Sequence, residues 1–238
     1  MKKITLFALP FAGGSRYSYA EFKNYLPEFI DLVSLELPGR GRRITEECLS
    51  GVREMTEDLL SAIRSETAGR YAFYGHSLGS LMAFLLTREI IREGLNPPVA
   101  LILSGRSGPS EKRRLPMIHD LPKDEFLSSL REMGGMPDVL LENEELMEFF
   151  EPIIRADLKA AETYVYEPAP PFNVPVSVMI GADEGIADSE AKAWQKETSV
   201  PIRFSKFPGH HFFIMDHADT VINEISEFLH SINLETIS

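Results

Sequence analysis

The chain has 238 residues, of which 44% are hydrophobic and 10% aromatic, and its formal net charge at pH 7 is −12. This length and composition fit one large α/β domain, or two small ones, with a sizeable core, so they exclude a disordered chain. The negative charge argues against a nucleic-acid partner, because nothing would neutralise phosphates over a broad face.

Short β runs alternate with helical runs along most of the chain. In chain order we expect a strand at 4–9, a helix at 19–26, strands at 30–36 and 70–74 separated by a helix at 52–66, a helix at 81–93, strands at 99–104 and 174–180, a helix at 189–198, a strand at 202–207 and a helix at 220–232. This alternation predicts an α/β fold with a mostly parallel central sheet flanked by helices.

The stretch 110–166 interrupts the alternation, because it carries no convincing strand. It predicts helices at 123–133, 143–150 and 151–164, with a break at Gly134-Gly135-Met136-Pro137. We therefore expect a single domain over 1–238, with a core formed by 1–109 and 167–238 and a helical lid inserted at about 110–166.

The most informative motif is Gly75-x-Ser77-x-Gly79, which lies between a β run and a helix-forming run. In a nucleophile elbow the serine occupies a sharp, strained strand-to-helix turn. Small residues are needed two positions before and after it, because strand and helix pass too closely there for a Cβ. The motif predicts that Ser77 is a nucleophile; an ordinary tight turn is the alternative.

A serine nucleophile needs a base and an acid, which follow it in the order serine, acid, histidine in enzymes built on this elbow. Only His210 and His211, after the last expected strand, have the right place for the base. Asp183 and Glu184 follow the strand at 174–180, and one of the two should orient the histidine; Asp188 is a weaker candidate.

Two backbone N–H groups are expected to stabilise the oxyanion of the transition state. One is that of Leu78, the residue after the nucleophile, and the other comes from Ala12-Gly13-Gly14, after the first strand. These glycines fit neither a P-loop nor G-x-G-x-x-G, and no metal-ligand spacing occurs, so neither a cofactor nor a metal is implied.

Seven stretches of the chain match a known protein family, and they occur in the same order as in that family. They are Leu9-Pro-Phe-Ala-Gly-Gly-Ser15, Leu37-Pro-Gly-Arg-Gly-x-Arg43, Tyr74-Gly-His-Ser-Leu-Gly79, Pro152-Ile-Ile-Arg-Ala-Asp157, Tyr164-x-Tyr166, Ala193-Trp194 and Phe207-Pro-Gly-His-His-Phe-Phe213. With these the chain resembles the type II thioesterases of nonribosomal peptide and polyketide synthesis, and the related acyl-carrier-protein thioesterases, which have the α/β-hydrolase fold.

The resemblance implies Ser77 as nucleophile, His211 as base and Ala12 as the second oxyanion donor. Counted back from Trp194, the family's catalytic aspartate falls on Glu184, with Asp183 beside it as the other candidate. Here His210 replaces the second glycine of the family's Gly-Gly-His-Phe.

The resemblance further implies a monomeric serine thioesterase that cleaves acyl or aminoacyl thioesters from the phosphopantetheine arm of a carrier protein, as an editing enzyme. The alternatives are a chain-terminating fatty acyl thioesterase and a ligand sensor built on a hydrolase fold. Cys48 is the only cysteine, and no apolar run approaches the length of a membrane span, so we expect a cytoplasmic protein that uses no membrane.

Two basic clusters are candidates for carrier docking, because the loops that hold them follow strands or open the expected lid. One cluster is Arg40, Arg42 and Arg43, and the other is Lys112, Arg113 and Arg114. The alternative for the first cluster is that one arginine is structural and pairs with a nearby carboxylate.

Overall fold

A computed structural model describes residues 2–112, 116–134, 136 and 138–235. Its sheet contains β1 (Ile4–Leu9), β2 (Ile30–Ser34), β3 (Tyr71–His76), β4 (Leu101–Ser104), β5 (Val176–Gly181) and β6 (Arg203–Phe207). The strand order is β2-β1-β3-β4-β5-β6, and all neighbours are parallel. The carboxyl ends of all six strands therefore meet at one edge, where ligands bind in such sheets.

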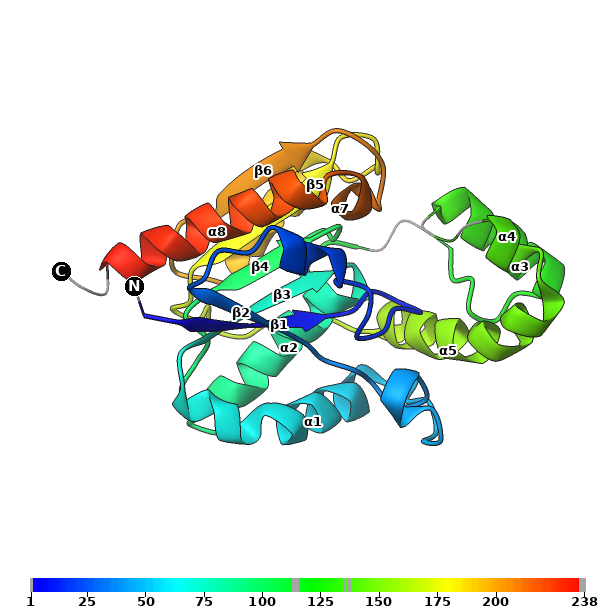
Figure 1. Ribbon diagram of the computed structural model, residues 1–238, viewed down its shortest axis with the longest axis horizontal. Helices are drawn as coiled ribbons and strands as arrows, with labels where there is room; N and C mark the ends of the chain where they lie inside the picture. Colours follow the sequence, from blue (N-terminus) through cyan, green and yellow to red (C-terminus); the bar gives the residue numbers. More distant parts are fainter. Residues whose placement is uncertain (1, 113–115, 135, 137, 236–238) are drawn as a thin grey trace.

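Helices cover both faces of this sheet (Figure 1). Helices α1 (Val52–Ile63) and α2 (Leu78–Arg92) lie on one face, and α7 (Phe213–Asp216) and α8 (Ala218–Glu235) on the other. Strand β1 shows why, since its side chains alternate: Phe7 and Leu9 join the cluster with α1 and α2, whereas Leu6 and Ala8 join the one with α8. The expected α/β class is confirmed.

A third apolar cluster lies outside these two layers, in the segment between β4 and β5. Helices α3 (Lys123–Met133), α4 (Asp138–Leu141) and α5 (Glu144–Thr163) lie beyond the carboxyl end of β1 (Figure 1). The buried members of the cluster are Ile118, Phe126, Leu130, Leu141, Met147, Ile154 and Leu158. The partly buried Ala12 packs against both this cluster and the α1–α2 cluster, so it lies where the two cores meet.

Some expected elements differ from those observed. Helix α5 is continuous through Pro152, where the sequence predicts a break between two helices. Proline removes one helical hydrogen bond, but Met147 and Ile154 on either side of Pro152 bury in the same cluster, and this burial keeps the helix in one piece.

The remaining differences are at short helices. The expected helix at 19–26 is a 3₁₀ turn, Glu21–Asn24, and the one at 189–198 divides into α6 (Asp188–Lys192) and the 3₁₀ turn Ala193–Lys196. Two further 3₁₀ turns, Gly41–Arg43 and Arg64–Ala68, flank α1. Short helices fix few hydrogen bonds, so tertiary contacts decide their form.

The tight crossing of β3 and α2 makes a prediction about stability. A Cβ added at Gly75 would lie 2.2 Å from the carbonyl carbon of Gly79, which cannot move without separating strand and helix. Gly75→Ala should therefore lower the free energy of unfolding in urea by about 3 kcal/mol. The control is Gly51→Ala at the start of α1, where the nearest group is the flexible Glu54 carboxylate at 3.3 Å. It should cost about 1 kcal/mol, and an equal loss in both variants would contradict the crossing argument.

Candidate active site

Ser77 occupies a strained backbone conformation at the turn between β3 and α2. Its φ is 56° and its ψ −111°, and among the described residues it is the only non-glycine with a positive φ. The sequence argument about the flanking glycines is confirmed: a Cβ at Gly79 would lie 2.1 Å from the Leu9 carbonyl oxygen, as close as the clash described for Gly75. The chain tolerates this strain only because the surrounding elements hold the turn fixed.

The N–H groups of Ala12 and Leu78 make no hydrogen bond among the described residues. The N–H of Leu78 is the first of α2, and the first N–H groups of a helix have no intrahelical partner. Neither Leu78 nor Ala12 donates its N–H to an acceptor within the described parts of the chain. By contrast, Gly13 N–H donates to Asp157 Oδ2 at 2.8 Å. The N–H groups of Ala12 and Leu78, the two expected oxyanion donors, are therefore both free to donate to a substrate oxygen.

Glu184 and His211 come together at the ends of β5 and β6. His211 Nδ1 lies 3.0 Å from Glu184 Oε2, and Glu184 Oε1 accepts the Gly181 N–H at 3.1 Å. The Glu184 side chain is fully buried, while that of His211 is partly exposed. This carboxylate is thus held at one oxygen and offers the other to the imidazole, as the orienting acid of a triad does.

Asp183 and His210 point away from that pair. Both are exposed, and His210 Nδ1 lies 3.2 Å from the Asp183 carbonyl oxygen. Asp188, the weaker candidate for the acid, instead forms an ion pair with Lys206 at 2.9 Å, and this hydrogen bond lowers its pKa. Of the acids and histidines that the sequence leaves open, the structure joins only Glu184 and His211.

His76 lies beside His211, and the sequence analysis does not anticipate this neighbour. The two rings are 4.7 Å apart between centroids, and His76 Nδ1 lies 3.0 Å from Ser104 Oγ. Complete burial, and secondarily the nearby His211, keep the pKa of His76 well below its usual value. His76 is therefore a neutral neighbour of His211.

The Ser77 hydroxyl itself makes no hydrogen bond within the described residues. Catalytic hydrogen bonds are often long without substrate and shorten only in the complex. The strained turn, the oriented imidazole and the two available N–H groups are the elements that nucleophilic acyl transfer requires.

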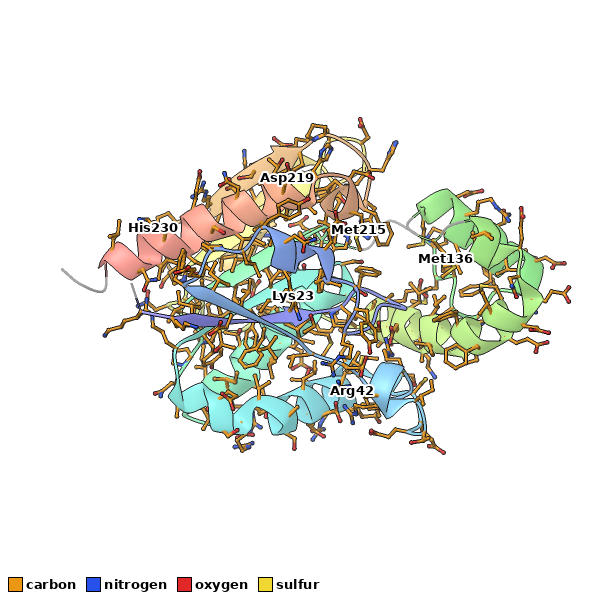
Figure 2. All side chains as sticks on the ribbon, in the orientation of Figure 1. Lys23, Arg42, Met136, Met215, Asp219 and His230 are labelled. Carbon is orange, nitrogen blue, oxygen red and sulfur yellow. The ribbon has the colours of Figure 1, made fainter. Side chains whose placement is uncertain are left out.

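A cleft of about 400 Å³ lies next to the histidine loop. It is lined by Met133, Gly134, Met136, His210, Phe212, Met215 and Asp216. Figure 2 labels Met136 on the segment that holds α3–α5 and Met215 on α7, so the cleft lies between these parts of the molecule. Methionine side chains are flexible and apolar, which suits a cleft that takes chains of varied shape.

Most of the first basic cluster is committed to internal ion pairs. Arg40 is buried and binds Asp157 through two hydrogen bonds, of 2.5 and 2.8 Å. Arg43 binds Asp58 in the same way and also Glu46. Arg42 is exposed. Thus Arg40 and Arg43 are structural, the alternative that the sequence left open for one arginine. Lys112 is exposed, while Arg113 and Arg114 lie outside the described residues.

The described residues offer neither a metal site nor a membrane-spanning helix. No three side chains among His, Cys, Asp and Glu gather closely enough to bind a metal ion. In the same part of the chain, no helix has the length and apolar character that crossing a membrane requires.

Comparison with known proteins gives consistent matches over nearly the whole chain. The model of the thioesterase domain family matches residues 4–229. Thioesterase PikA5 of Streptomyces venezuelae is 34% identical over 229 residues, which is 95% of this chain and 81% of that protein.

Two solved structures extend the match to the fold. ClbQ, from the colibactin NRPS/PKS pathway, superposes with a TM-score of 0.93 at 32% identity, covering 98% of this chain and 99% of the other. The type II thioesterase BorB, from the borrelidin biosynthetic cluster, gives a TM-score of 0.85 at 32% identity over 94% and 92% of the two chains.

These matches agree with the elbow at Ser77 and with the parallel sheet that presents it. The fold is therefore the α/β-hydrolase fold, and the chain belongs to the thioesterase domain family, as a thioester hydrolase related to the type II thioesterases of nonribosomal peptide and polyketide pathways.

Proposed function

We propose that this thioesterase hydrolyses acyl or aminoacyl thioesters from the phosphopantetheine arm of carrier proteins and thereby removes stalled or incorrect acyl groups. The observation that carries the proposal is the pairing of Glu184 with His211 beside a strained serine turn. Family membership supports the thioester chemistry, and the pathways named for relatives such as ClbQ support a carrier protein as the partner.

In this mechanism Ser77 Oγ attacks the thioester carbonyl and transfers its proton to His211. The tetrahedral oxyanion accepts hydrogen bonds from the N–H groups of Ala12 and Leu78. The intermediate collapses to an acyl-serine, and the pantetheine thiolate leaves with the proton from His211. Water then gives a proton to His211, attacks the acyl-serine and releases the carboxylic acid and free Ser77.

Glu184 is the acid in this proposal, with Asp183 as the alternative. Glu184 is supported by its contact with His211 Nδ1 and by its full burial. A buried carboxylate bonded to Nδ1 leaves Nε2 as the nitrogen that accepts the serine proton, and it stabilises the imidazolium that forms.

Helices α3–α5 act as a lid over the active site in this proposal, inserted at about 110–166 into a single domain whose core is 1–109 and 167–238. Their own apolar cluster supports this division. The methionine-lined cleft between the lid segment and α7 would then admit the acyl chain, and its lining by His210 and Phe212 brings it to the catalytic loop. A lid excludes water from the acyl-enzyme.

The setting that we propose is a monomer in the cytoplasm, with no nucleic-acid partner. The single cysteine and the net charge of −12 support it.

The first prediction concerns the nucleophile. Ser77→Ala should fold normally but lose about 10⁴-fold or more in kcat, because the covalent route is removed. Hydrolysis of an acyl-N-acetylcysteamine thioester measures this loss, and a serine-directed fluorophosphonate should label the wild type at Ser77 alone. Label at another serine, or full activity of the variant, would show that Ser77 is not the nucleophile.

The second prediction separates the two candidate acids. Glu184→Gln should lower kcat by about 10³–10⁴-fold, because the imidazole loses its orienting charge. Asp183→Asn is the matched control, since it makes the same chemical change one residue away at an exposed position, and it should remain near wild type. The reverse result would move the acid to Asp183.

The third prediction separates editing from chain termination. An editing enzyme should hydrolyse short and varied acyl groups with similar kcat/KM, because it must accept whatever stalls. Mass spectrometry of a panel of acyl-loaded carrier proteins measures this preference. A strong preference for one medium or long chain would instead indicate termination, and stoichiometric labelling of Ser77 without turnover would indicate a ligand sensor.

A further inference from the structure

A buried ion pair holds the loop that contributes Ala12. Asp157 in α5 is fully buried, and Arg40 in the loop after β2 is 3% exposed. The two terminal guanidinium nitrogens of Arg40, Nη1 and Nη2, donate to the two carboxylate oxygens of Asp157 at 2.5 and 2.8 Å. This planar, two-bond geometry fixes the direction of both side chains.

The same two side chains also bind the backbone next to Ala12. Asp157 Oδ2 accepts the Gly13 N–H at 2.8 Å, and Arg40 Nη1 donates to the Gly14 carbonyl oxygen at 3.2 Å. The loop is thus held through two backbone groups, the Gly13 N–H as donor and the Gly14 carbonyl oxygen as acceptor. The Gly13 N–H is occupied, whereas the Ala12 N–H has no acceptor among the described residues.

Close packing of Gly13 against Ile154 of α5 also holds the loop in place. Gly13 has a φ of +76°, which favours glycine, and a Cβ there would lie 2.8 Å from Ile154 Cγ1 of α5. Ile154 is one turn before Asp157 on the same helix. Helix α5 therefore contacts the loop at two successive turns.

Charge explains why an ion pair serves here and a lone carboxylate would not. Asp157 binds the residue that follows the proposed oxyanion donor, and an unpaired negative charge in this buried position would oppose the charge that develops on the substrate. Arg40 is bound to both carboxylate oxygens and cancels that charge. The pair can thus hold Gly13 at little electrostatic cost to the oxyanion.

We propose that Asp157 and Arg40 are positioning residues of the oxyanion hole, which fix the Ala12 N–H through Gly13 and Gly14 and tie its geometry to the lid helix α5. The inference rests on the proposed role of Ala12 and Leu78 as oxyanion donors. Neither Asp157 nor Arg40 touches the substrate; they act on the tetrahedral oxyanion through the loop.

The test replaces the pair by apolar side chains. Arg40→Met combined with Asp157→Leu removes both buried charges together, so no unpaired charge remains and folding should persist. The matched control is Arg43→Met combined with Asp58→Leu, an ion pair of the same two-bond geometry that begins in the same loop but does not contact the oxyanion loop. Thermal unfolding of all variants reports stability separately.

The readout distinguishes the transition state from the ground state. With a small acyl thioester, the Arg40/Asp157 variant should lose about 10–10³-fold in kcat at a similar KM, up to the cost of one oxyanion donor. In the complex with an alkyl trifluoromethyl ketone, Ser77 Oγ adds to the ketone carbonyl and its proton passes to His211. The carbonyl oxygen then becomes an oxyanion that lies in the oxyanion hole. The inhibition constant of the ketone should rise in proportion to the loss in kcat. The matching alkyl thioether, which has no carbonyl, should bind to the Arg40/Asp157 variant with the same affinity as to the wild type.

A conservative variant gives the rescue and protects the test against misfolding. Arg40→Gln combined with Asp157→Asn keeps a neutral polar pair whose amide oxygen can still accept the Gly13 N–H. It should regain part of the lost kcat and of the ketone affinity. If the apolar variant does not fold, the Arg40→Gln/Asp157→Asn variant can be tested by itself. Its kcat and its affinity for the ketone should both be lower than those of the wild type, in the same proportion.

The outcomes separate this inference from the proposed function. A wild type that forms no ketone adduct at Ser77 would contradict the proposed mechanism itself. A wild type that forms the adduct, with folded Arg40/Asp157 variants that keep both kcat and ketone affinity within about twofold, would overturn the positioning role alone. Equal losses in the Arg43/Asp58 control would also overturn it, since they would reflect general stability.

Discussion

The close approach of β1, β3 and α2 is the constraint on which the rest of the site depends. Glycine at positions 75 and 79 lets the strand, the helix and the Leu9 carbonyl come within a distance that no Cβ permits. This approach forces the positive φ of Ser77. It also brings the first N–H of α2 next to the end of β1, so the position of the proposed nucleophile and the positions of both proposed oxyanion donors follow from the same close approach.

The buried Arg40–Asp157 pair extends this constraint to the helical segment. Burying an ion pair seldom adds much stability compared with apolar side chains, but it does demand one geometry. Here that geometry joins three segments far apart in sequence: the loop after β1, the loop after β2 and α5. Helix α5 and the loop after β1 are therefore joined by direct hydrogen bonds at this point.

The sequence predicted the fold well and the long-range polar contacts poorly. Alternating β runs and the Gly75-x-Ser77-x-Gly79 motif are local patterns, and they led to the six strands and the strained turn. The contact of Arg40 with Asp157 spans 117 positions, and nothing local in either segment indicates it. In the sequence, Arg40 and Asp157 only belong to two of the stretches that carry the family resemblance, and Arg40 also falls in a candidate docking cluster in which one arginine could be structural.

The same limit explains two smaller differences. Pro152 predicts a helix break by a local rule, but the burial of Met147 and Ile154 in one cluster is a tertiary effect that the rule ignores. Likewise, chain order cannot choose between His210 and His211 or between Asp183 and Glu184. The choice depends on which side chains point inward where β5 and β6 end. Backbone hydrogen bonds between the two loops determine these directions, and one of them runs from the Asp183 N–H to the Gly209 carbonyl oxygen.

The contacts of Glu184 show how a glutamate can occupy the position to which the family resemblance assigns an aspartate. Glutamate has one more methylene group, so an unsupported side chain would lose more conformational freedom when it orients the imidazole. Glu184 offsets this by folding back onto its own strand, where Oε1 accepts the Gly181 N–H and Oε2 remains for His211. The extra methylene group of Glu184 lies within the turn after β5, and the histidine loop keeps its backbone hydrogen bond from Asp183 N–H to the Gly209 carbonyl oxygen. The longer side chain of the proposed acid is therefore fixed at both oxygens, because Oε1 is bound to the strand that precedes it.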